Sequence, residues 1–397
     1  MLATVQIPAL NRDPFSEENL RDPYPLQNEM REAGPVVWLP RYDVFATARY
    51  AEISLILNDW KTFCSSAGIG LANFRKEKPW RPPSLVLEAD PPEHTAARAI
   101  LTRALAPAPL RGLREMFTRE AQSHVERLLA LGTFDAIKEL AAGYPLKVFG
   151  DALGIAPDER EIILEYGNMS FNALGPRNAI CLESMKNAES VSAWIMGRCQ
   201  RNALSRDGLG AIIYQAVDQG EVSEQDAAMM VRSFLSAGID TTVRAIGSGL
   251  YLFAQSPDQW QILRDDPSLA RAAFEEILRL ESPFQTAFRT TTKAVEVAGI
   301  AIPNDQKIML SFAGGNRDPR KWDDPERFDI RRRTAGHLGF GAGIHGCLGQ
   351  MLARLEVDIL LTEMAKRISS IEVVETPEYL LNNTVRGFKK LVVRVSA

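Results

Sequence analysis

The feature that most constrains this chain is a glycine-rich stretch near its C-terminus, Phe340 to Gly349, with the sequence FGAGIHGCLG. Its one cysteine, Cys347, is followed by apolar residues at helical spacing from Gln350 to Ile368. Glycine can adopt positive φ and lets the backbone approach a flat ligand with no Cβ in the way. A cysteine near a helix N-terminus is favoured as a thiolate, because unpaired N–H groups and the helix dipole stabilise negative charge. We therefore interpret this stretch as a cradle for a haem iron, with Cys347 as the axial ligand.

The same glycines, Gly341, Gly343 and Gly346, also satisfy the G-x-G-x-x-G fingerprint of dinucleotide-binding proteins. That fingerprint follows a buried strand early in a βαβ unit. Here it follows the polar run Thr334 to His337, close to the C-terminus and with no clear strand before it. The context disfavours a nicotinamide cofactor and favours haem.

The FGAGIHGCLG stretch resembles the cysteine-ligand loop of the cytochrome P450 superfamily, the haem-thiolate monooxygenases. A second stretch, Phe234 to Thr242 (FLSAGIDTT), places an acid and an alcohol in a long apolar segment, where they are costly to bury without partners. Read alone, this stretch is also compatible with a threonine bonded to the preceding turn and an aspartate that reaches the surface. In the superfamily, A-G-x-D-T marks the helix that crosses the oxygen site. The resemblance implies that Asp240 and Thr241 deliver protons to bound dioxygen and that Gly238 makes room.

Two further motifs bear on the same resemblance. Glu276 and Arg279 are three residues apart and so share a helix face, which by itself is typical of an exposed ion pair. Further along the chain is the motif PERF, which contains Arg327. The resemblance implies that Glu276, Arg279 and Arg327 form a structural ion network beneath the haem.

A haem carries two propionates, and burying carboxylates without cations and donors is costly. The resemblance implies that the haem is bound by residues from several segments: His94, Arg98, Arg289, His337, Phe340, Gly341 and His345. Taken singly, a histidine or arginine is more often a structural hydrogen-bonding group. It is their joint occurrence that favours a haem site.

The chain resembles soluble bacterial members throughout its length, and in particular a subfamily that oxidises para-substituted benzoates. The stretches that carry this likeness are KPWRPPS (78–84), VRSFLS (231–236) and NNTVRG (382–387). The likeness implies that a substrate carboxylate is bound by Arg81, Ser84, Arg232 and Ser233. It implies that Leu87, Phe171 and Ser236 form an apolar slot beside this carboxylate site. Guanidinium and hydroxyl groups suit an anionic head.

Some observations leave the details of this pocket open. From the residues alone, Arg81 could face solvent and Ser233 could bond within its own helix. Three wall positions depart from the subfamily, because Leu174 and Ala287 stand where it has aromatic residues and Phe284 where it has a smaller aliphatic one. The position of the substrate ring is therefore not fixed by the resemblance.

The resemblance implies haem b with an axial thiolate, which favours O–O cleavage and the oxidation of an unactivated C–H bond. We expect a small aromatic acid to be hydroxylated or O-demethylated, according to which C–H bond the pocket presents. Nothing resembles a fused flavin or iron–sulfur module, so electrons are expected from NAD(P)H through a ferredoxin reductase and a ferredoxin. The alternatives are oxidation of another small aromatic or hydrophobic substrate, a peroxide-driven catalyst, a non-catalytic haem-thiolate sensor and a purely structural helical protein.

Composition and length limit the partners. The chain has 397 residues, of which 46% are hydrophobic and 24% charged, an ordinary globular composition with enough length for a large core. A net charge of -4 disfavours nonspecific nucleic-acid binding. No apolar run reaches the ~18 residues of a spanning helix, and Met1 to Pro14 lacks the features of a signal peptide, so we expect a soluble cytoplasmic protein with no membrane partner. The four cysteines are too scattered to indicate a zinc site or a disulfide framework.

The expected fold is mainly α with a smaller β-rich region, in one haem-thiolate monooxygenase domain over residues 1–397. The resemblance implies the cytochrome P450 fold, with haem between the oxygen-site helix and the helix after the cysteine loop. Apolar periodicity predicts helices within 91–280 and 350–368, notably Leu110 to Leu131, Ala188 to Leu204, Glu224 to Ala254 and Pro257 to Leu280. Alternating β-branched residues predict short strands near 34–50, 291–312 and 388–396.

Overall fold

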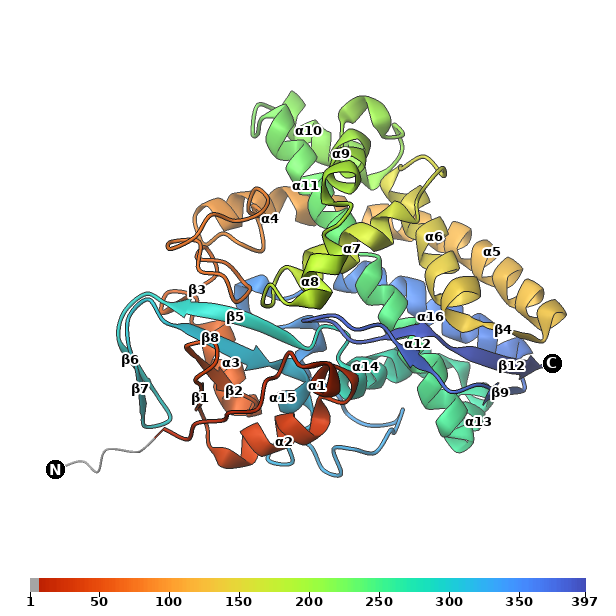
Figure 1. Cartoon of the computed structure of the whole chain (residues 1–397). Helices are drawn as coiled ribbons and strands as arrows, with labels where there is room; N and C mark the ends of the chain where they lie inside the picture. Colours follow the sequence, from red (N-terminus) through yellow and green to blue (C-terminus); the bar gives the residue numbers. More distant parts are fainter. Residues whose placement is uncertain (1–6) are drawn as a thin grey trace.

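The computed structural model describes residues 7–397, so the part of the signal-peptide expectation that concerns residues 1–6 lies outside the described residues. The chain is mainly helical with a smaller β region, as the sequence predicts (Figure 1). The α-helices are α1 Glu17–Arg21, α2 Tyr24–Ala33, α3 Tyr50–Asn58, α4 Glu93–Ala104, α5 Pro107–Leu131, α6 Gly143–Leu153, α7 Ile162–Asn172, α8 Ala179–Ser184, α9 Ala188–Arg198, α10 Leu209–Asp218, α11 Glu224–Ala237, α12 Asp240–Gln255, α13 Pro257–Asp265, α14 Ala270–Glu281, α15 Phe312–Asn316 and α16 Gln350–Arg367.

The strands are short and form four small sheets among the described residues. Their bounds are β1 Val37–Leu39, β2 Val44–Thr47, β3 Phe63–Cys64, β4 Thr133–Asp135, β5 Thr286–Thr291, β6 Val295–Val297, β7 Ile300–Ile302, β8 Lys307–Ser311, β9 Ser370–Val373, β10 Glu378–Tyr379, β11 Phe388–Lys390 and β12 Val392–Ser396. The largest sheet has the order β1-β2-β8-β5-β3 and lies on the left of Figure 1, beside the helices. Its strand β5 pairs antiparallel with β8, with Ala287 opposite Leu310.

Three predicted β segments are confirmed. The segment near residues 34–50 forms the antiparallel hairpin of β1 and β2. The run Val295 to Ile302 is not one strand but the hairpin of β6 and β7, because Ala298 and Gly299 take positive φ values of 49° and 83° and turn the chain. The C-terminal strand β12 lies between β4 and β9.

The helices around the site belong to one large hydrophobic core. Helix α12 runs through the centre of Figure 1, and α16 packs against both α5 and α14. Helix α12 is buried on nearly all sides, and Leu352, Val357 and Leu360 of α16 are at most 2% exposed. This packing fixes the two helices that flank the cysteine loop and the oxygen-site motif.

Two predicted helices are each divided, which corrects the sequence-based bounds. Glu224 to Ala254 breaks at Gly238 and Ile239 into α11 and α12. The hydroxyls of Thr241 and Thr242 donate to the carbonyl oxygens of Ala237 and Gly238 at 2.8 and 3.0 Å, so side chains compete with the backbone ladder at the break.

The second division lies between α13 and α14, where Pro257 to Leu280 was predicted as one helix. Pro267 causes it, because proline lacks an N–H and disfavours the helical conformation at Asp266. Similarly, the predicted helix Ala188 to Leu204 ends as α9 at Arg198 and continues only as a short 3-10 turn.

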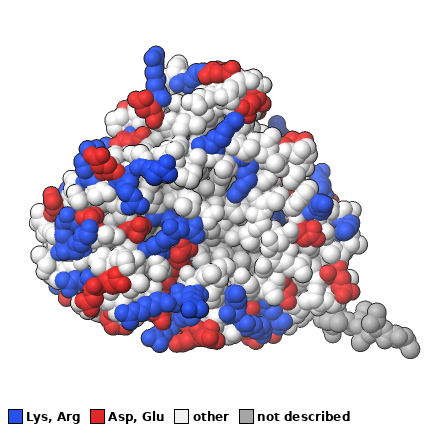
Figure 2. Space-filling model, turned by 180° about the vertical axis from the view of Figure 1, so that it is seen from behind, with Lys and Arg blue, Asp and Glu red and all other residues white. Residues whose placement is uncertain are grey.

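Surface and interior agree with a globular chain. Cys64, Cys181 and Cys199 are buried free cysteines, as predicted for core residues. Within residues 7–397, no helix combines the length and the apolar character needed to cross a membrane. Figure 2 shows basic and acidic side chains interspersed over the described part of the face seen from behind.

Candidate active site

The cysteine loop is closed by its own backbone. The N–H of Cys347 donates to the carbonyl oxygen of Phe340 at 2.7 Å, and α16 begins three residues after the cysteine. Gly341 has φ 66°, a conformation that glycine adopts without strain. A Cβ at Gly343 would lie 2.2 Å from the carbonyl oxygen of Leu57, so only glycine lets the loop approach the end of α3 so closely. The predicted need for glycines in a tight cradle is thus met at these two positions.

Cys347 lies on the wall of a cavity of about 270 Å³. Burial raises the pKa of the Cys347 thiol, while backbone N–H groups of Gly349 and Gln350 and the charges of Arg98 and Arg354 act in the opposite direction. The start of the helix therefore favours the thiolate electrostatically, as the sequence predicts. Burial of the thiol has the larger effect on its pKa and acts in the opposite direction.

The cavity brings together most of the predicted site residues. Those on its wall are Arg81, Leu87, Arg98, Phe171, Leu174, Ser233, Ser236, Gly238, Thr241, Phe284, Ala287, Arg289, Phe340, Gly341, His345 and Cys347. Those that do not line it are Ser84, His94, Arg232, Asp240, Glu276, Arg279, Arg327 and His337. The predicted residues come from α4, α7, α11, α12, β5 and the cysteine loop, so distant parts of the sequence converge on one space.

Cationic and donor groups gather at one side of the cavity. His94 lies behind the wall with its ring centroid 4.5 Å from that of His345, and all four ring nitrogens are buried without a hydrogen-bond partner. Burial, together with the charges of His345 and Arg98, lowers the pKa of His94 to about 4. Burial lowers the pKa of Arg289 to about 10. Such buried, unpartnered donors fit a ligand that carries carboxylates.

One carboxylate and one backbone carbonyl of the protein lie close to this cluster. Asp90 Oδ1 is 3.9 Å from His345 Nε2, beyond hydrogen-bond distance, and Asp90 accepts instead from the N–H groups of Ser65 and Ser66. Arg98 donates from Nη2 to the carbonyl oxygen of Gly346 at 2.7 Å, which ties it to the cysteine loop. These residues therefore fit a flat apolar macrocycle that carries carboxylates, with Cys347 as the residue that would hold its metal.

His337 is placed differently from the expectation. Its Nε2 lies 2.7 Å from Glu275 Oε2, and its Nδ1 accepts from the N–H of Gly339 at 3.0 Å. Glu275 is also paired with Arg354. Both ring nitrogens are used in this local network and the residue is not on the cavity wall, so we correct its role from a propionate contact to a support of the cysteine loop.

The oxygen-site motif lies at the break between α11 and α12. Gly238 and Thr241 line the cavity. A Cβ at Gly238 would lie 2.5 Å from Cζ of Phe149, so the glycine is required by the close approach of α6. The sequence predicts a glycine here to leave room for dioxygen. The structure adds a second reason, the close packing against Phe149, which the sequence did not reveal.

Asp240 points away from the cavity and is paired within its own helix. Its Oδ2 accepts from Nε of Arg244 at 2.9 Å, and the two side chains are 8% and 3% exposed. A Cβ at Gly167 would lie 2.8 Å from Asp240 Cβ, and one at Gly387 would lie 2.7 Å from Arg244 Cγ. Two glycines thus let neighbouring segments enclose the ion pair, which answers the question of how the acid is buried.

The residues predicted to bind a carboxylate form a polar corner at the cavity, in which Arg81 and Ser233 line the wall and Ser84 and Arg232 do not. The hydroxyls of Ser84 and Ser233 are 3.3 Å apart. Arg81 donates from Nη1 to Oε2 of Glu88 at 2.9 Å, and its Nε is buried without a partner. Arg232 is 4% exposed and donates from Nη2 to the carbonyl oxygen of Pro82 at 3.0 Å. Burial lowers the pKa of the Arg232 guanidinium.

The other walls are apolar. The rings of Phe171 and Phe284 have centroids 5.7 Å apart, and those of Phe284 and Phe312 are also 5.7 Å apart. These three rings form a continuous aromatic wall, with Leu174 and Ala287 among its neighbours on the cavity. Phe312 was missed from the sequence, because it follows a strand and starts the short helix α15 rather than lying in a motif.

The predicted ion network is present, with one member exchanged. Arg279 donates from Nε and Nη2 to the two carboxylate oxygens of Glu276 at 2.7 and 2.8 Å, and both side chains are fully buried. Arg327 contributes its carbonyl oxygen, at 3.4 Å from Arg279 Nη2, and the residue is exposed. The second cation is Arg332, whose Nε donates to Glu276 Oε1 at 3.1 Å. We therefore correct Arg327 from an ionic to a backbone role.

Three polar residues of the site were not predicted. Ser170 and Glu356 line the cavity, and each has a buried side-chain oxygen without a partner. Burial raises the pKa of Glu356 to about 8. Glu88, in the polar corner, is 6% exposed. Spacing along the sequence offers no signal for them, because each becomes notable only through what surrounds it in space.

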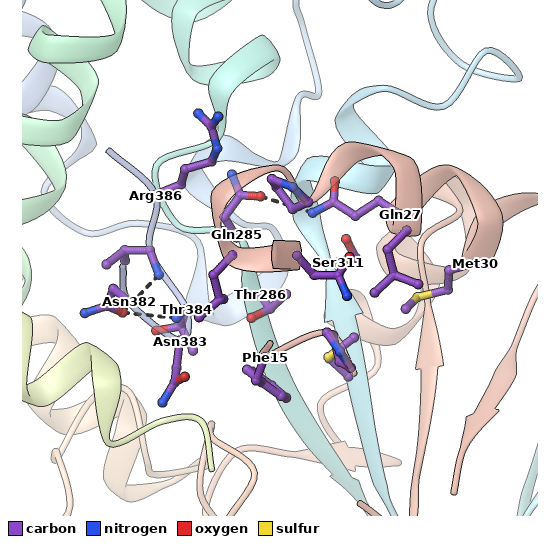
Figure 3. Close-up of a pocket in the computed structure, with 17 residues that line it drawn as sticks. Phe15, Gln27, Met30, Gln285, Thr286, Ser311, Asn382, Asn383, Thr384 and Arg386 are labelled. Atoms are coloured by element: carbon purple, nitrogen blue, oxygen red, sulfur yellow. Dashed lines mark hydrogen bonds between the residues drawn. The ribbon is translucent and has the colours of Figure 1, made fainter. Parts of the chain in front are cut away.

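A smaller cavity of about 40 Å³ lies behind the main one. Its wall combines residues of α2, β5 and the stretch 382–386, including Gln27, Thr286 and Thr384 (Figure 3). Thr286 precedes Ala287 on β5, and successive side chains of a strand point to opposite faces. The two cavities are therefore on opposite faces of β5, and the small one contains none of the predicted site residues.

Comparisons with known proteins agree with this geometry. The family model described as cytochrome P450 matches residues 198–371. The chain is 48% identical over 391 residues to cytochrome p450 CYP199A2 of Rhodopseudomonas palustris, covering 98% of this chain and 95% of the relative. A structure of CYP109Q5 from Chondromyces apiculatus matches with a TM-score of 0.80 at 29% identity, covering 99% of each chain. A structure of cytochrome P450 CREJ with (4-ethylphenyl) dihydrogen phosphate matches with a TM-score of 0.88 at 26% identity, covering 97% of this chain and 99% of that one.

The chain belongs to the cytochrome P450 family. It is a P450 monooxygenase, an oxidoreductase that uses molecular oxygen and a haem held by a cysteine thiolate. The predicted P450 fold, with its smaller β region, is confirmed by the solved relatives.

Proposed function

We propose that this monooxygenase oxidises a small aromatic carboxylic acid at the substituent across the ring from the carboxylate, by O-demethylation or hydroxylation. The observation that carries the proposal is the division of one cavity into a polar corner with Arg81, an aromatic wall and a cysteine loop. Such a division orients an amphipathic ring with its anionic end away from the thiolate. Orientation of this kind decides which C–H bond is presented for reaction.

The polar corner suits an anion in charge and in donors. Arg81, Arg232 and Glu88 together carry two positive charges and one negative, which leaves a net charge of +1 for a substrate carboxylate to balance. The unpartnered Nε of Arg81 and the hydroxyl pair of Ser84 and Ser233 are the donors available to it. Ser233 donates to the carbonyl oxygen of Met229 at 3.1 Å in the structure, so it exchanges this helix bond for the substrate.

The aromatic wall suits the ring. Phe171 and Phe284 lie where edge or face contacts with a benzene ring are favourable, and Leu87 and Leu174 add apolar contacts. Phe284 and Ala287, two positions at which the sequence departs from the benzoate-oxidising subfamily, both line the cavity, so we propose that the ring lies differently from its position in that subfamily. CREJ, which resembles this chain at 26% identity, has a structure with (4-ethylphenyl) dihydrogen phosphate, a para-substituted aromatic anion. That ligand supports the same substrate chemistry here.

Cys347 is the proposed axial ligand of haem b, with Phe340 and Gly341 forming the loop under the macrocycle. The carboxylates of the haem would be bound by His94, Arg98, Arg289 and His345, whose buried donors otherwise lack partners or hold only backbone carbonyls. When bound, the haem supplies the activation of dioxygen that inserts one oxygen atom into a C–H bond.

We propose that protons are supplied by residues at the start of α12. Thr241 lines the cavity, and its hydroxyl, now donated to Ala237, can turn to donate into the cavity. Asp240 is the adjacent acid and is paired with Arg244. Both residues border the helix break, where backbone carbonyls are already bonded by side chains.

Electrons are proposed to come from NAD(P)H through a ferredoxin reductase and a ferredoxin. A basic docking face for an acidic partner would include Arg331, which is exposed, and Arg103, which is paired with exposed Glu221. We propose a cytoplasmic location for this reaction. A peroxide-driven or sensor role would not use the Asp240 and Thr241 pair.

The test is binding and turnover of 4-methoxybenzoate. The proposal expects a spin-state change on titration and formaldehyde in a system with a ferredoxin, its reductase and NADH. 4-Methoxybenzamide serves as the matched neutral control and should bind more weakly. If the acid gives neither a spin-state change nor formaldehyde, while a neutral aromatic gives both, the alternative monooxygenase of neutral substrates replaces this proposal.

A further inference from the structure

Glu88 is a buried acid next to a residue proposed to bind the substrate carboxylate. Its side chain is 2% exposed and pairs with Arg81, which lines the cavity, while Glu88 itself does not. One oxygen, Oε2, accepts both from Nη1 of Arg81 at 2.9 Å and from the backbone N–H of Ser84 at 2.7 Å. The same acid thus touches two of the residues proposed to bind the substrate carboxylate.

The contact with Glu88 uses one end of the Arg81 guanidinium. Nη1 donates to Glu88 and to the carbonyl oxygen of Pro82 at 3.0 Å, and Nη2 is 3.5 Å from the other oxygen of Glu88. Nε is left buried and without a partner. A substrate carboxylate that bonds to Nε of Arg81 would share the cation with a resident carboxylate.

We propose that Glu88 is a built-in counter-ion that weakens the hold of this cavity on aromatic carboxylates. It neutralises Arg81 when no substrate is present, so the arginine is not left buried and unpaired. It also repels a second carboxylate across the guanidinium, because the two like charges face each other over one cation. The inference rests on the proposed function, since it requires Arg81 to bind a substrate carboxylate.

Weaker binding of the carboxylate would speed the release of product in this reaction. Oxidation at the far end of the ring leaves the carboxylate unchanged, so the polar corner contacts the product as it contacts the substrate. An unopposed pair of arginines, Arg81 and Arg232, would hold both tightly and slow the departure of the product. The two guanidinium groups of the corner carry a charge of +2, and the carboxylate of Glu88 lowers the net charge to +1.

The test is the variant Glu88→Gln, which preserves the size and an acceptor for Ser84 but removes the charge. We expect the Kd of 4-methoxybenzoate, read from the spin-state titration, to fall about tenfold, given the size of a like-charge interaction at such separations. The Kd of 4-methoxybenzamide should stay within about twofold, because a neutral head senses little of the removed charge. Turnover should show a lower KM together with a lower kcat and slower release of 4-hydroxybenzoate.

The matched control is Glu77→Gln, which removes the same charge from an exposed residue near this loop and should change neither Kd. Arg81→Gln and the double variant Arg81→Gln with Glu88→Gln complete the set. The double variant removes both members of the ion pair, so neither is left buried and unpaired, and it remains available for measurement if a single variant fails to fold. In the Arg81→Gln background the acid should bind more weakly than in the unaltered protein, because the shared cation is lost.

The outcomes separate this inference from the proposed function. If the unaltered protein binds neither 4-methoxybenzoate nor another aromatic acid, the proposed function fails and takes the inference with it. If the acid binds but Glu88→Gln leaves its Kd unchanged, weakens it, or shifts acid and amide alike, the inference alone is overturned.

Discussion

Glu356 gives the most quantitative prediction, because it is a buried acid without a cation. It lies in the middle of α16 on the wall of the main cavity, and its Oε1 has no hydrogen-bond partner. Burial raises its pKa from 4.5 to about 8. The side chain is therefore neutral in the folded protein at pH 7 and ionised in the unfolded chain.

The sign of the pH effect follows from these two values. Between pH 4.5 and about 8 the unfolded chain releases a proton that the folded protein keeps, so the free energy of unfolding falls as pH rises through this window. The penalty relative to a group with an unshifted pKa is about 1.4 kcal/mol at pH 5.5 and about 4 kcal/mol at pH 7.5. Glu356→Gln removes the ionisable group, so its advantage over the unaltered protein should grow by about 2.5 kcal/mol between these pH values.

The assay is urea unfolding of both haem-loaded proteins at pH 5.5 and 7.5, followed by circular dichroism. The difference between the two pH values cancels any fixed cost of burying an amide. Glu363→Gln on the same helix is the control, because Lys366 and Arg367 overcome the effect of burial and lower the pKa of Glu363, so that this carboxyl is ionised at both pH values and its loss should change the free energy of unfolding equally at each. An advantage of Glu356→Gln that is the same at both pH values would refute the reasoning, since it would show that the carboxyl is not held neutral.

Three other variants test separate parts of the site. Thr241→Ala should leave the Kd of 4-methoxybenzoate within about twofold but lower the product formed per NADH at least about tenfold, because a hydroxyl that supplies protons is lost; unchanged coupling would speak against that role. Glu276→Ala leaves Arg279 buried and unpaired, so the free energy of unfolding should fall by about 3–5 kcal/mol in denaturant titrations; a loss below about 1 kcal/mol would mean that the network is well solvated. Gly238→Ala forces a Cβ toward Phe149 and should cost about 1–3 kcal/mol in thermal unfolding, and an unaffected midpoint would contradict the close packing.

Much of the fold and the chemical centre could be predicted from the sequence because the signals are local. The loop around Cys347 depends on glycines that are required by nearby backbone, and the helix that follows it begins three residues after the cysteine. The same is true of the β1 and β2 hairpin and of the paired Glu276 and Arg279 on one turn of α14. In each case the residues that create the feature are neighbours in the chain.

The features that the sequence did not reveal depend on contacts between distant segments. Arg332, rather than Arg327, reaches Glu276 because the loop after α15 folds back so that the side chain of Arg327 is exposed. His337 is captured by Glu275 and so does not reach the cavity. Glu88 is adjacent to Arg81 only after the loop 81–88 closes. Such pairings are set by tertiary packing, for which one sequence contains no periodic signal.

The break between α11 and α12 shows a different limit. The apolar pattern continues through Gly238 without interruption, so periodicity predicts one helix. The interruption arises from hydroxyls of Thr241 and Thr242 that bond to carbonyls one turn back, together with the close contact of Gly238 with Phe149. The oxygen-site motif could therefore be found from the sequence, but its local geometry could not.

The central claim is that the thiolate of Cys347 binds the haem iron, and the absorption spectrum of the reduced protein with carbon monoxide tests it most directly. The account predicts the red-shifted Soret band of a thiolate-ligated haem for the unaltered protein, and its loss, together with the loss of turnover, in Cys347→Ser. Cys199→Ser, at a buried cysteine away from the cavity, should keep the band. A Cys347→Ser protein that retains both the red-shifted band and turnover would contradict the account.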